Sequence, residues 1–243
     1  MFSFILNILF PPRCLACNSY LSTNNNSNLF RKNYPLLCEQ CFKNIPINNS
    51  FYCPFCHNRL PELKNFCHPQ VKYILAAASS YQNTAIRETI HALKFQSVKK
   101  AAETLNQIIN LYLEKISHHL LANFNNQNSV IIPVPLHPKK ERKRGFNQSL
   151  LIAEILAGYL KTDIEKEVLF KSKNTPSQTE VANEKRKENV QNSFGVKNNK
   201  KIAGKNIILV DDVFTTGATL NEAVKVLKST NVKKIIAFVI AKS

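Results

Sequence analysis

Three Cys-x-x-Cys pairs stand close together near the N-terminus of this 243-residue chain, and they constrain its fold more than any other feature. All seven cysteines occur before residue 68. They are Cys14, Cys17, Cys38, Cys41, Cys53, Cys56 and Cys67. The segment around them is poor in apolar residues, so burial alone would hardly stabilise a domain of about 70 residues. A metal or a covalent cross-link is therefore expected to stabilise it.

Zinc is the metal that this spacing favours. A two-residue spacer lets both thiolates of a pair bind one tetrahedral ion, and two pairs about 15–20 residues apart form a four-cysteine site. Zinc binding would also supply folding free energy. Pairing in sequence order would give one site of Cys14, Cys17, Cys38 and Cys41, and a second of Cys53, Cys56, Cys67 and either His57 or His68. Interleaved pairing is equally compatible with the sequence.

Two other uses of the cysteines compete with zinc. Disulfides suit a small secreted domain, but the apolar segment 1–10 lacks the basic region and cleavage site of a signal peptide. The Cys53-Pro-Phe-Cys56 pair alone would fit a redox site, although such a motif belongs near a βαβ unit rather than among further pairs. No apolar run approaches the 18 or so residues of a membrane helix. We therefore expect a cytoplasmic protein.

Glycine is scarce, and its spacing excludes several enzyme classes. No two of the five glycines lie within five residues of each other. Neither a dinucleotide-binding GxGxxG motif nor a Walker loop can therefore be written anywhere in the chain. A GxSxG nucleophile elbow is absent as well.

Strand-like and helix-like patterns alternate from residue 71 onward. Strands are expected at 73–81, 130–134, 207–210 and 234–240, and helices at 85–95, 101–121, 148–160 and 218–228. This alternation predicts an α/β domain with a mostly parallel sheet and helices on both faces. The expected organisation is a zinc-ribbon-like domain at 1–70 and the α/β domain at 71–243. A mobile loop is expected at 171–194, where the periodicity fails.

Acidic and hydroxyl residues follow the apolar strand at 207–210 directly. Asp211 and Asp212 come first, and then Thr215, Thr216, Gly217, Ala218 and Thr219 lead into a helix. A helix N-terminus after a parallel strand favours an anion, and a glycine lets the backbone approach a ligand closely. Two acids beside such a phosphate cradle suit sugar hydroxyls or Mg²⁺, provided that the chain leaves the strand there. The alternative, a simple helix cap, needs only one of these residues.

The chain is strongly basic, with 33 Lys and Arg against 16 Asp and Glu and a net charge of +17. Such a charge attracts polyanions, although lysine used only for solubility would produce it too. The densest run, 137–144, ends at Arg144. Three interpretations stay open for it: pyrophosphate recognition, binding of a nucleic-acid backbone, or a solvated loop. Phe146 beside it would either stack on a base or belong to the core.

The Asp-Asp-Val-Phe-Thr-Thr-Gly-Ala-Thr segment resembles the phosphoribosyl-pyrophosphate signature of type I phosphoribosyltransferases. Two further motifs, Pro133-Val-Pro-Leu-His and Arg144-Gly-Phe-Asn-Gln, agree with it. Together with the cysteine array they make the whole chain similar to the ComF family. That family joins a double zinc ribbon to a phosphoribosyltransferase-like domain. The family pattern has an eighth cysteine where this chain has Gln70.

The resemblance implies roles for individual residues. Asp211 and Asp212 would be the catalytic acids that bind the ribose hydroxyls, and residues 215–219 would hold the 5′-phosphate. Lys94 is a candidate for the pyrophosphate, with Mg²⁺ as the accompanying ion. Gln178 and Arg186 would close over the site from the loop.

The resemblance also implies a function. It indicates a competence protein that binds phosphoribosyl pyrophosphate and handles single-stranded DNA in natural transformation, together with other DNA-uptake proteins. The alternative is an active phosphoribosyltransferase, which would transfer ribose 5-phosphate to a nitrogenous base and release pyrophosphate.

Overall fold

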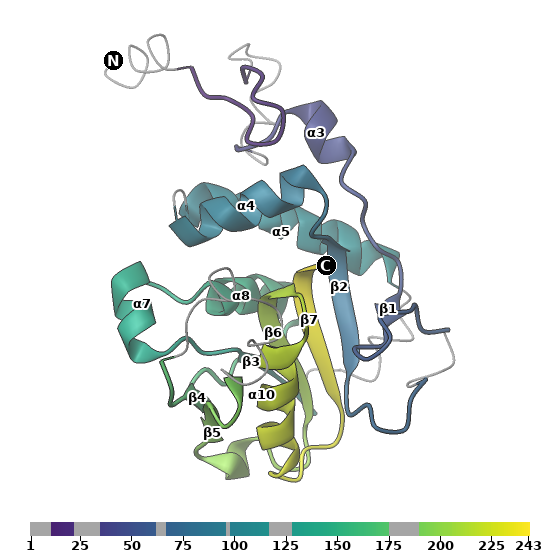
Figure 1. Cartoon of the computed structure of the whole chain (residues 1–243), viewed down its shortest axis with the longest axis vertical. Coiled ribbons are helices and arrows are strands. Elements are labelled where there is room, and N and C mark those ends of the chain that lie inside the picture. The colour runs from purple at the N-terminus through teal and green to yellow at the C-terminus, as the bar shows by residue number, and fades with distance from the viewer. Residues whose placement is uncertain (1–10, 22–34, 62–66, 96–97, 117–127, 175–189) are drawn as a thin grey trace.

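The computed structural model describes residues 11–21, 35–61, 67–95, 98–116, 128–174 and 190–243. At its centre is a five-stranded sheet in the order β1-β2-β7-β6-β3. Its strands are β1 (Phe51–Tyr52), β2 (Ile74–Ser80), β3 (Ser129–Pro133), β6 (Asn206–Phe214) and β7 (Ile235–Lys242). Strands β2, β7, β6 and β3 are parallel, and β1 adds an antiparallel edge (Figure 1). The mostly parallel sheet predicted from the alternating pattern is confirmed.

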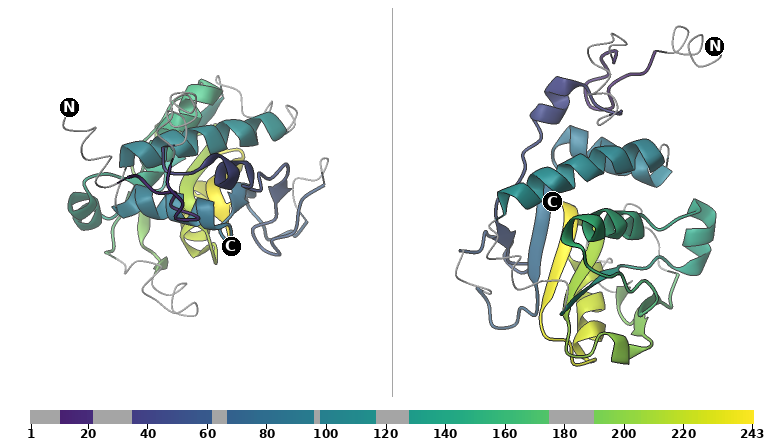
Figure 2. Two further views of the ribbon diagram at one scale, coloured as in Figure 1. Left: turned by 90° about the horizontal axis from the view of Figure 1, so that it is seen from above. Right: turned by 180° about the vertical axis from the view of Figure 1, so that it is seen from behind.

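Helices cover both faces of this sheet, as predicted. One face packs against α4 (Thr84–Phe95), α5 (Val98–Lys115) and α8 (Gln148–Leu160), and the other packs against α10 (Ala218–Lys228). The strands are apolar on both sides because both sides are covered, which is typical of a parallel sheet. Figure 2 shows α4 and α5 lying across one end of the strands.

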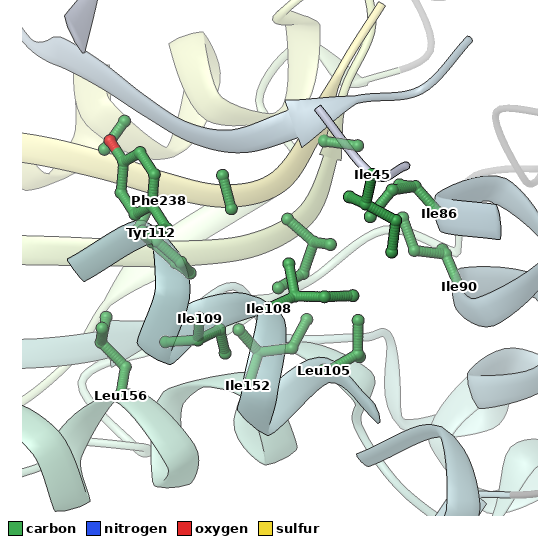
Figure 3. Close-up of a cluster of buried hydrophobic side chains, with 14 of the residues drawn as sticks. Ile45, Ile86, Ile90, Leu105, Ile108, Ile109, Tyr112, Ile152, Leu156 and Phe238 are labelled. Atoms are coloured by element: carbon green, nitrogen blue, oxygen red, sulfur yellow. The ribbon is translucent and has the colours of Figure 1, made fainter. Parts of the chain in front are cut away.

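The larger core lies between the sheet and the three helices on its first face. Leu105, Ile108 and Ile109 of α5 are fully buried there, next to Ile152 of α8 (Figure 3). These residues recur at the three- and four-residue spacing of a helix that buries one side. The predicted end of this helix at residue 121 lies outside the described residues.

The cysteine-rich segment packs onto the same core. Ile45, which follows the short helix α3 (Glu39–Lys43), lies beside Ile86 and Ile90 of α4 (Figure 3). The chain then runs along β2, where the Asn48 side-chain amide donates to the Ala77 carbonyl at 2.8 Å. Strand β1 lies within residues 1–70, the range predicted to form the zinc-ribbon-like domain. The two predicted domains therefore share one sheet and one core.

Two expectations about element ends are wrong. The strand predicted at 207–210 continues to Phe214, because β7 still runs beside it and pairs Val213 with Ala241. The chain therefore does not leave the strand at Asp211 and Asp212, although leaving it there is the condition under which the sequence predicts that both acids meet one ligand. The predicted loop at 171–194 begins and ends in strands: β4 (Leu169–Lys171) pairs antiparallel with β5 (Phe194–Val196). Residues 175–189 of that loop, including Gln178 and Arg186, lie outside the described residues.

The remaining described elements are short. Helix α7 (Pro138–Arg144) begins after His137, which caps it, and ends at Gly145. Gly145 has a φ of 85°, a left-handed conformation that glycine adopts without strain. A 3₁₀ turn, η2 (Asn199–Lys201), precedes β6. Figure 1 shows α7 at the side of the sheet where α8 and β3 lie.

The α5 core makes a direct stability prediction. Replacing the fully buried Ile108 by alanine should lower the free energy of unfolding by about 2–5 kcal/mol, because the smaller side chain leaves a cavity. Chemical denaturation followed by circular dichroism measures this. The matched control Lys115→Ala, on the exposed side of the same helix, should change it by less than about 0.5 kcal/mol. Equal values for the two variants would contradict the packing described.

Candidate phosphate and sugar site with two metal clusters

The acidic pair lies where β6 extends past its neighbour β3. The last contact between these strands is the hydrogen bond from the Val134 amide to the Val210 carbonyl, at 2.8 Å. Beyond it, β7 is the only strand among the described residues that pairs with β6. Asp211 and Asp212 follow immediately and are 7% and 6% exposed. The pair is thus fixed on a rigid strand at an edge that β3 leaves uncovered.

Asp211 is held by the first turn of α8. Its carboxylate accepts a hydrogen bond from the Ser149 hydroxyl at 2.9 Å and another from the Asp212 amide at 2.9 Å. Ser149 is placed by Asn147, which caps α8 and accepts from the Ser149 amide at 3.0 Å. Burial raises the pKa of Asp211 above its usual range, and the neighbouring Asp212 carboxylate raises it further. The sequence pattern did not identify Ser149, which only the packing of α8 brings to β6.

Asp212 is held from α4. The Lys94 ammonium group forms an ion pair with its Oδ2 atom, and the Val213 amide donates to Oδ1 at 2.8 Å. Burial by itself favours the neutral amine of Lys94, but the attraction and hydrogen bond of Asp212 outweigh it. The pKa of Lys94 is therefore raised, and the side chain stays charged. Lys94, predicted as a pyrophosphate ligand, lies against the acidic pair itself.

The loop from Thr215 to Thr219 forms a small concavity in front of α10. It is lined by Val213, Phe214, Thr215, Gly217, Ala218, Thr219 and Leu220. Gly217 is the N-cap of α10 and has a φ of 73°, with no side-chain cap bond. A Cβ atom there would lie 2.8 Å from the Phe214 ring, so glycine is required by both conformation and space. The Thr216 hydroxyl accepts from the Ala218 amide at 3.4 Å, as the helix-cap alternative expects of one residue, whereas Asp212 bonds the Val213 amide and Lys94 instead.

Basic residues surround the acidic pair. Arg144, at the end of α7, donates to the Gln148 side chain at 2.6 Å. Burial lowers the pKa of Lys171 in β4, the charge of Lys140 lowers it further, and Asp211 opposes both. Phe146, the aromatic residue singled out in the sequence, is only half-buried. The site therefore combines two carboxylates, a helix N-terminus and several cations, which together suit a phosphorylated sugar.

The first cysteine cluster contains Cys14, Cys17, Cys38 and Cys41. All four sulfur atoms lie within 4.8 Å of one another, and those of Cys17 and Cys38 are 3.7 Å apart. A tetrahedral ion with bonds of about 2.3 Å needs ligand atoms roughly 3.8 Å apart. Hydrogen bonding by Ser19 lowers the pKa of Cys17 to about 6, which favours the metal-binding thiolate. The cluster could hold a metal ion, and its four members are those predicted by pairing the cysteines in sequence order.

The second cluster contains three cysteines and a histidine. Its members are Cys53, Cys56, Cys67 and His68, again within 4.8 Å of one another. The Nδ1 atom of His68 lies 3.0 Å from the Cys67 sulfur and 3.6 Å from that of Cys53. This chain has Gln70 where the family pattern has a fourth cysteine, and His68 takes the fourth position of the cluster instead. Three thiolates and one imidazole are a zinc-binding set.

His57, the other candidate for this set, contacts Phe214 at the end of β6 instead. Its ring meets the Phe214 ring edge-on, with centroids 5.2 Å apart. Phe214 in turn packs against Gly217. The second cluster therefore lies next to the concavity at α10.

Comparison with known proteins agrees with this geometry. The family model described as phosphoribosyl transferase domain matches residues 101–243, which is more than half of the chain. The chain belongs to the phosphoribosyl transferase domain family. The matched range contains the acidic pair, the loop before α10 and Arg144, but it begins after Lys94.

Curated relatives extend the likeness to the cysteine-rich segment. Competence protein F of Haemophilus influenzae is 28% identical over 241 residues, covering 95% of this chain and 97% of that protein. Competence protein ComFC of Bacillus subtilis is 27% identical over 231 residues, covering 88% of each chain. DNA utilization protein YhgH of Shigella flexneri is 27% identical over 196 residues, covering 79% of this chain and 83% of that protein. The resemblance to the ComF family is confirmed.

No helix among the described segments is both long enough and apolar enough to cross a membrane.

The second cluster predicts a difference between two histidines. His68→Ala should reduce the metal content from two ions to one per chain, because it removes a ligand. His57→Ala should leave it at two, because His57 contacts Phe214 rather than the sulfur atoms. Elemental analysis of the purified, dialysed variants measures both values. Metal loss in His57→Ala but not in His68→Ala would contradict the assignment.

Proposed function

We propose that this protein binds phosphoribosyl pyrophosphate and handles single-stranded DNA in natural transformation. One observation supports the first part above all: the buried Asp211/Asp212 pair directly precedes the Gly217 loop at the N-terminus of α10. The second part rests on relatives named for competence and DNA utilization, whose matches cover 79% to 95% of this chain. Other DNA-uptake proteins would be its partners.

The ligand's chemistry matches the two halves of the site. Carboxylates accept hydrogen bonds from ribose hydroxyls, and the N-terminus of α10 attracts the 5′-phosphate. The cations Arg144 and Lys171 stand near the acidic pair, where a pyrophosphate would need positive charge. Lys94 would exchange its contact with Asp212 for one with the ligand.

Magnesium fits this site only as the companion of the ligand. Asp212 already pairs with Lys94, and one oxygen of Asp211 accepts two hydrogen bonds. A divalent ion bound directly by both acids would have to displace these partners. We therefore place Mg²⁺ on the pyrophosphate, where it would neutralise charge.

Zinc is the ion that we propose for both cysteine clusters. Its role would be structural, because each site has four protein ligands and no open position. The clusters would stabilise a segment that is poor in apolar residues and attach it to the α4 core. Zinc binding then contributes directly to folding.

An active phosphoribosyltransferase is the second candidate function. The complete acidic pair, within the range matched by the family model, favours it. Fixed carboxylates could stabilise the positive charge that develops on the ribose when pyrophosphate leaves. Pyrophosphate release on addition of a base would distinguish transfer from binding alone.

Asp212→Asn should weaken binding of phosphoribosyl pyrophosphate with Mg²⁺ by about ten-fold or more, because it removes a charged acceptor. Isothermal titration calorimetry measures the affinity, and the same samples are assayed for pyrophosphate. The control Glu154→Gln makes the same change in net charge on an exposed part of α8 and should bind normally. Unchanged affinity in Asp212→Asn would overturn the role assigned to the pair.

The basic helix α7 predicts a salt effect on DNA binding. Replacing Lys139, Lys140, Arg142 and Lys143 by alanine should flatten the salt dependence of affinity for single-stranded DNA, by about 0.7 in slope for each phosphate that these residues neutralise. Fluorescence anisotropy at several salt concentrations measures the slope. The control replaces Lys225, Lys228, Lys233 and Lys234, which lie at the opposite end of the parallel strands. An equal decrease of slope in the control would show attraction by net charge alone.

A further inference from the structure

One strongly exposed aromatic side chain lies at the edge of the candidate site. Phe95 is the last residue of α4 and is 64% exposed. It directly follows Lys94, whose ammonium group pairs with Asp212. A single exposed phenylalanine is ordinary on a protein surface. Tyr20 and Phe55 are each 61% exposed and also have a planar neighbour, Arg13 and His68 respectively, but both belong to the cysteine-rich segment. Phe95 differs because it combines planar neighbours with a position directly after a residue that binds Asp212.

Two side chains flank the ring of Phe95. The Arg144 guanidinium carbon lies 5.5 Å from the ring centroid, within the range of a cation–π contact. The ring of His91 lies 4.9 Å away, one helical turn earlier on the same side of α4. Both neighbours are themselves able to stack or to donate hydrogen bonds.

Arg144 is held in place rather than free to swing into solvent. It donates to the Gln148 side chain at 2.6 Å, and Gln148 is buried in the first turn of α8. The same turn carries Ser149, which holds Asp211. One helix end therefore holds both Asp211 and the cation over Phe95.

We infer that Phe95, with Arg144 and His91, is a stacking platform for a nucleobase. The inference rests on the proposed function, which brings a base to this site either as a free acceptor or as part of single-stranded DNA. Every base presents a flat π-face, so an aromatic ring beside an arginine binds it with little sequence preference. The ribose of the ligand would lie at Asp212, whose partner Lys94 directly precedes the platform on α4.

Other exposed aromatic rings are less suited to this role. Tyr159 is 41% exposed but lies eleven residues after Gln148 on α8, about 16 Å along the helix axis. Phe170 is equally exposed, but its ring packs against Gly195. Phe146 is half-buried. Phe95 alone among these four combines high exposure with a position directly beside a residue that binds the acidic pair.

The absence of tryptophan from the chain provides a direct test. Phe95→Trp introduces one fluorescent ring at the platform, and Tyr159→Trp introduces a matched control at the far end of α8. Each variant is titrated with a thymidine oligonucleotide, with an abasic oligonucleotide of equal length, and with free adenine in the presence and absence of phosphoribosyl pyrophosphate. The abasic strand carries the same phosphates but no bases.

We expect base-dependent quenching in Phe95→Trp only. If the thymidine strand quenches, the ligand of the platform is a base of single-stranded DNA. If free adenine quenches only when phosphoribosyl pyrophosphate is present, the ligand is an acceptor base. Equal quenching by the abasic strand, equal quenching in both variants, or no quenching by any base would overturn the platform.

A second variant separates this inference from the proposed function. Phe95→Leu should weaken binding of the ligand that quenches by about five-fold or more, while calorimetry shows unchanged affinity for phosphoribosyl pyrophosphate. If the wild-type protein fails to bind phosphoribosyl pyrophosphate but the thymidine strand quenches Phe95→Trp, the sugar-phosphate proposal fails and the platform stands. If the sugar phosphate binds and no base quenches, the platform alone fails.

Discussion

The parallel pairing of β6 with β7 continues after β3 has ended, and the candidate site depends on this difference in strand length. While β6 has neighbours on both sides, it is apolar and buried, as the run Ile207 to Val210 requires. Past Val210, β3 no longer pairs with β6, and two aspartates occupy this part of the strand while its hydrogen bonds to β7 continue. A ligand site at the carboxyl ends of parallel strands follows from the same geometry in other α/β folds.

Electrostatics then divide the two adjacent acids between different partners. Asp211 accepts a hydrogen bond from Ser149 of α8, and Asp212 forms an ion pair with the ammonium group of Lys94. Because the pKa of Asp211 is raised in the folded state, the native chain holds that proton more tightly than the unfolded chain does. Its contribution to stability therefore decreases as the pH rises through its shifted range. Ligands with hydroxyl or cationic groups would offset the unfavourable free energy of two buried carboxylates side by side. This suits a binding site better than a structural one.

The cysteine-rich segment is part of the same structural unit as the sheet. It contributes β1 to the sheet and Ile45 to the α4 core, and its His57 ring contacts the ring of Phe214 at the end of β6. The composition change near residue 70 marks the end of the cysteine clusters, which could hold metal ions. It does not mark a spatial boundary, because composition carries no information about which surfaces meet.

The sequence by itself determined the elements and the chemistry of this protein. Apolar runs and helical spacing predicted the parallel sheet and its helices, and the segment from Asp211 to Thr219 predicted acidic and hydroxyl groups in front of a helix, because these patterns depend on neighbouring residues alone. Only the tertiary structure decided which groups meet: His68 rather than His57 at the second cysteine cluster, Lys94 and Ser149 at the two acids, and Phe95 beside Arg144. The contacts of Lys94, Ser149 and Phe95 join elements far apart in the chain, and their geometry is set by how the helices pack on the sheet.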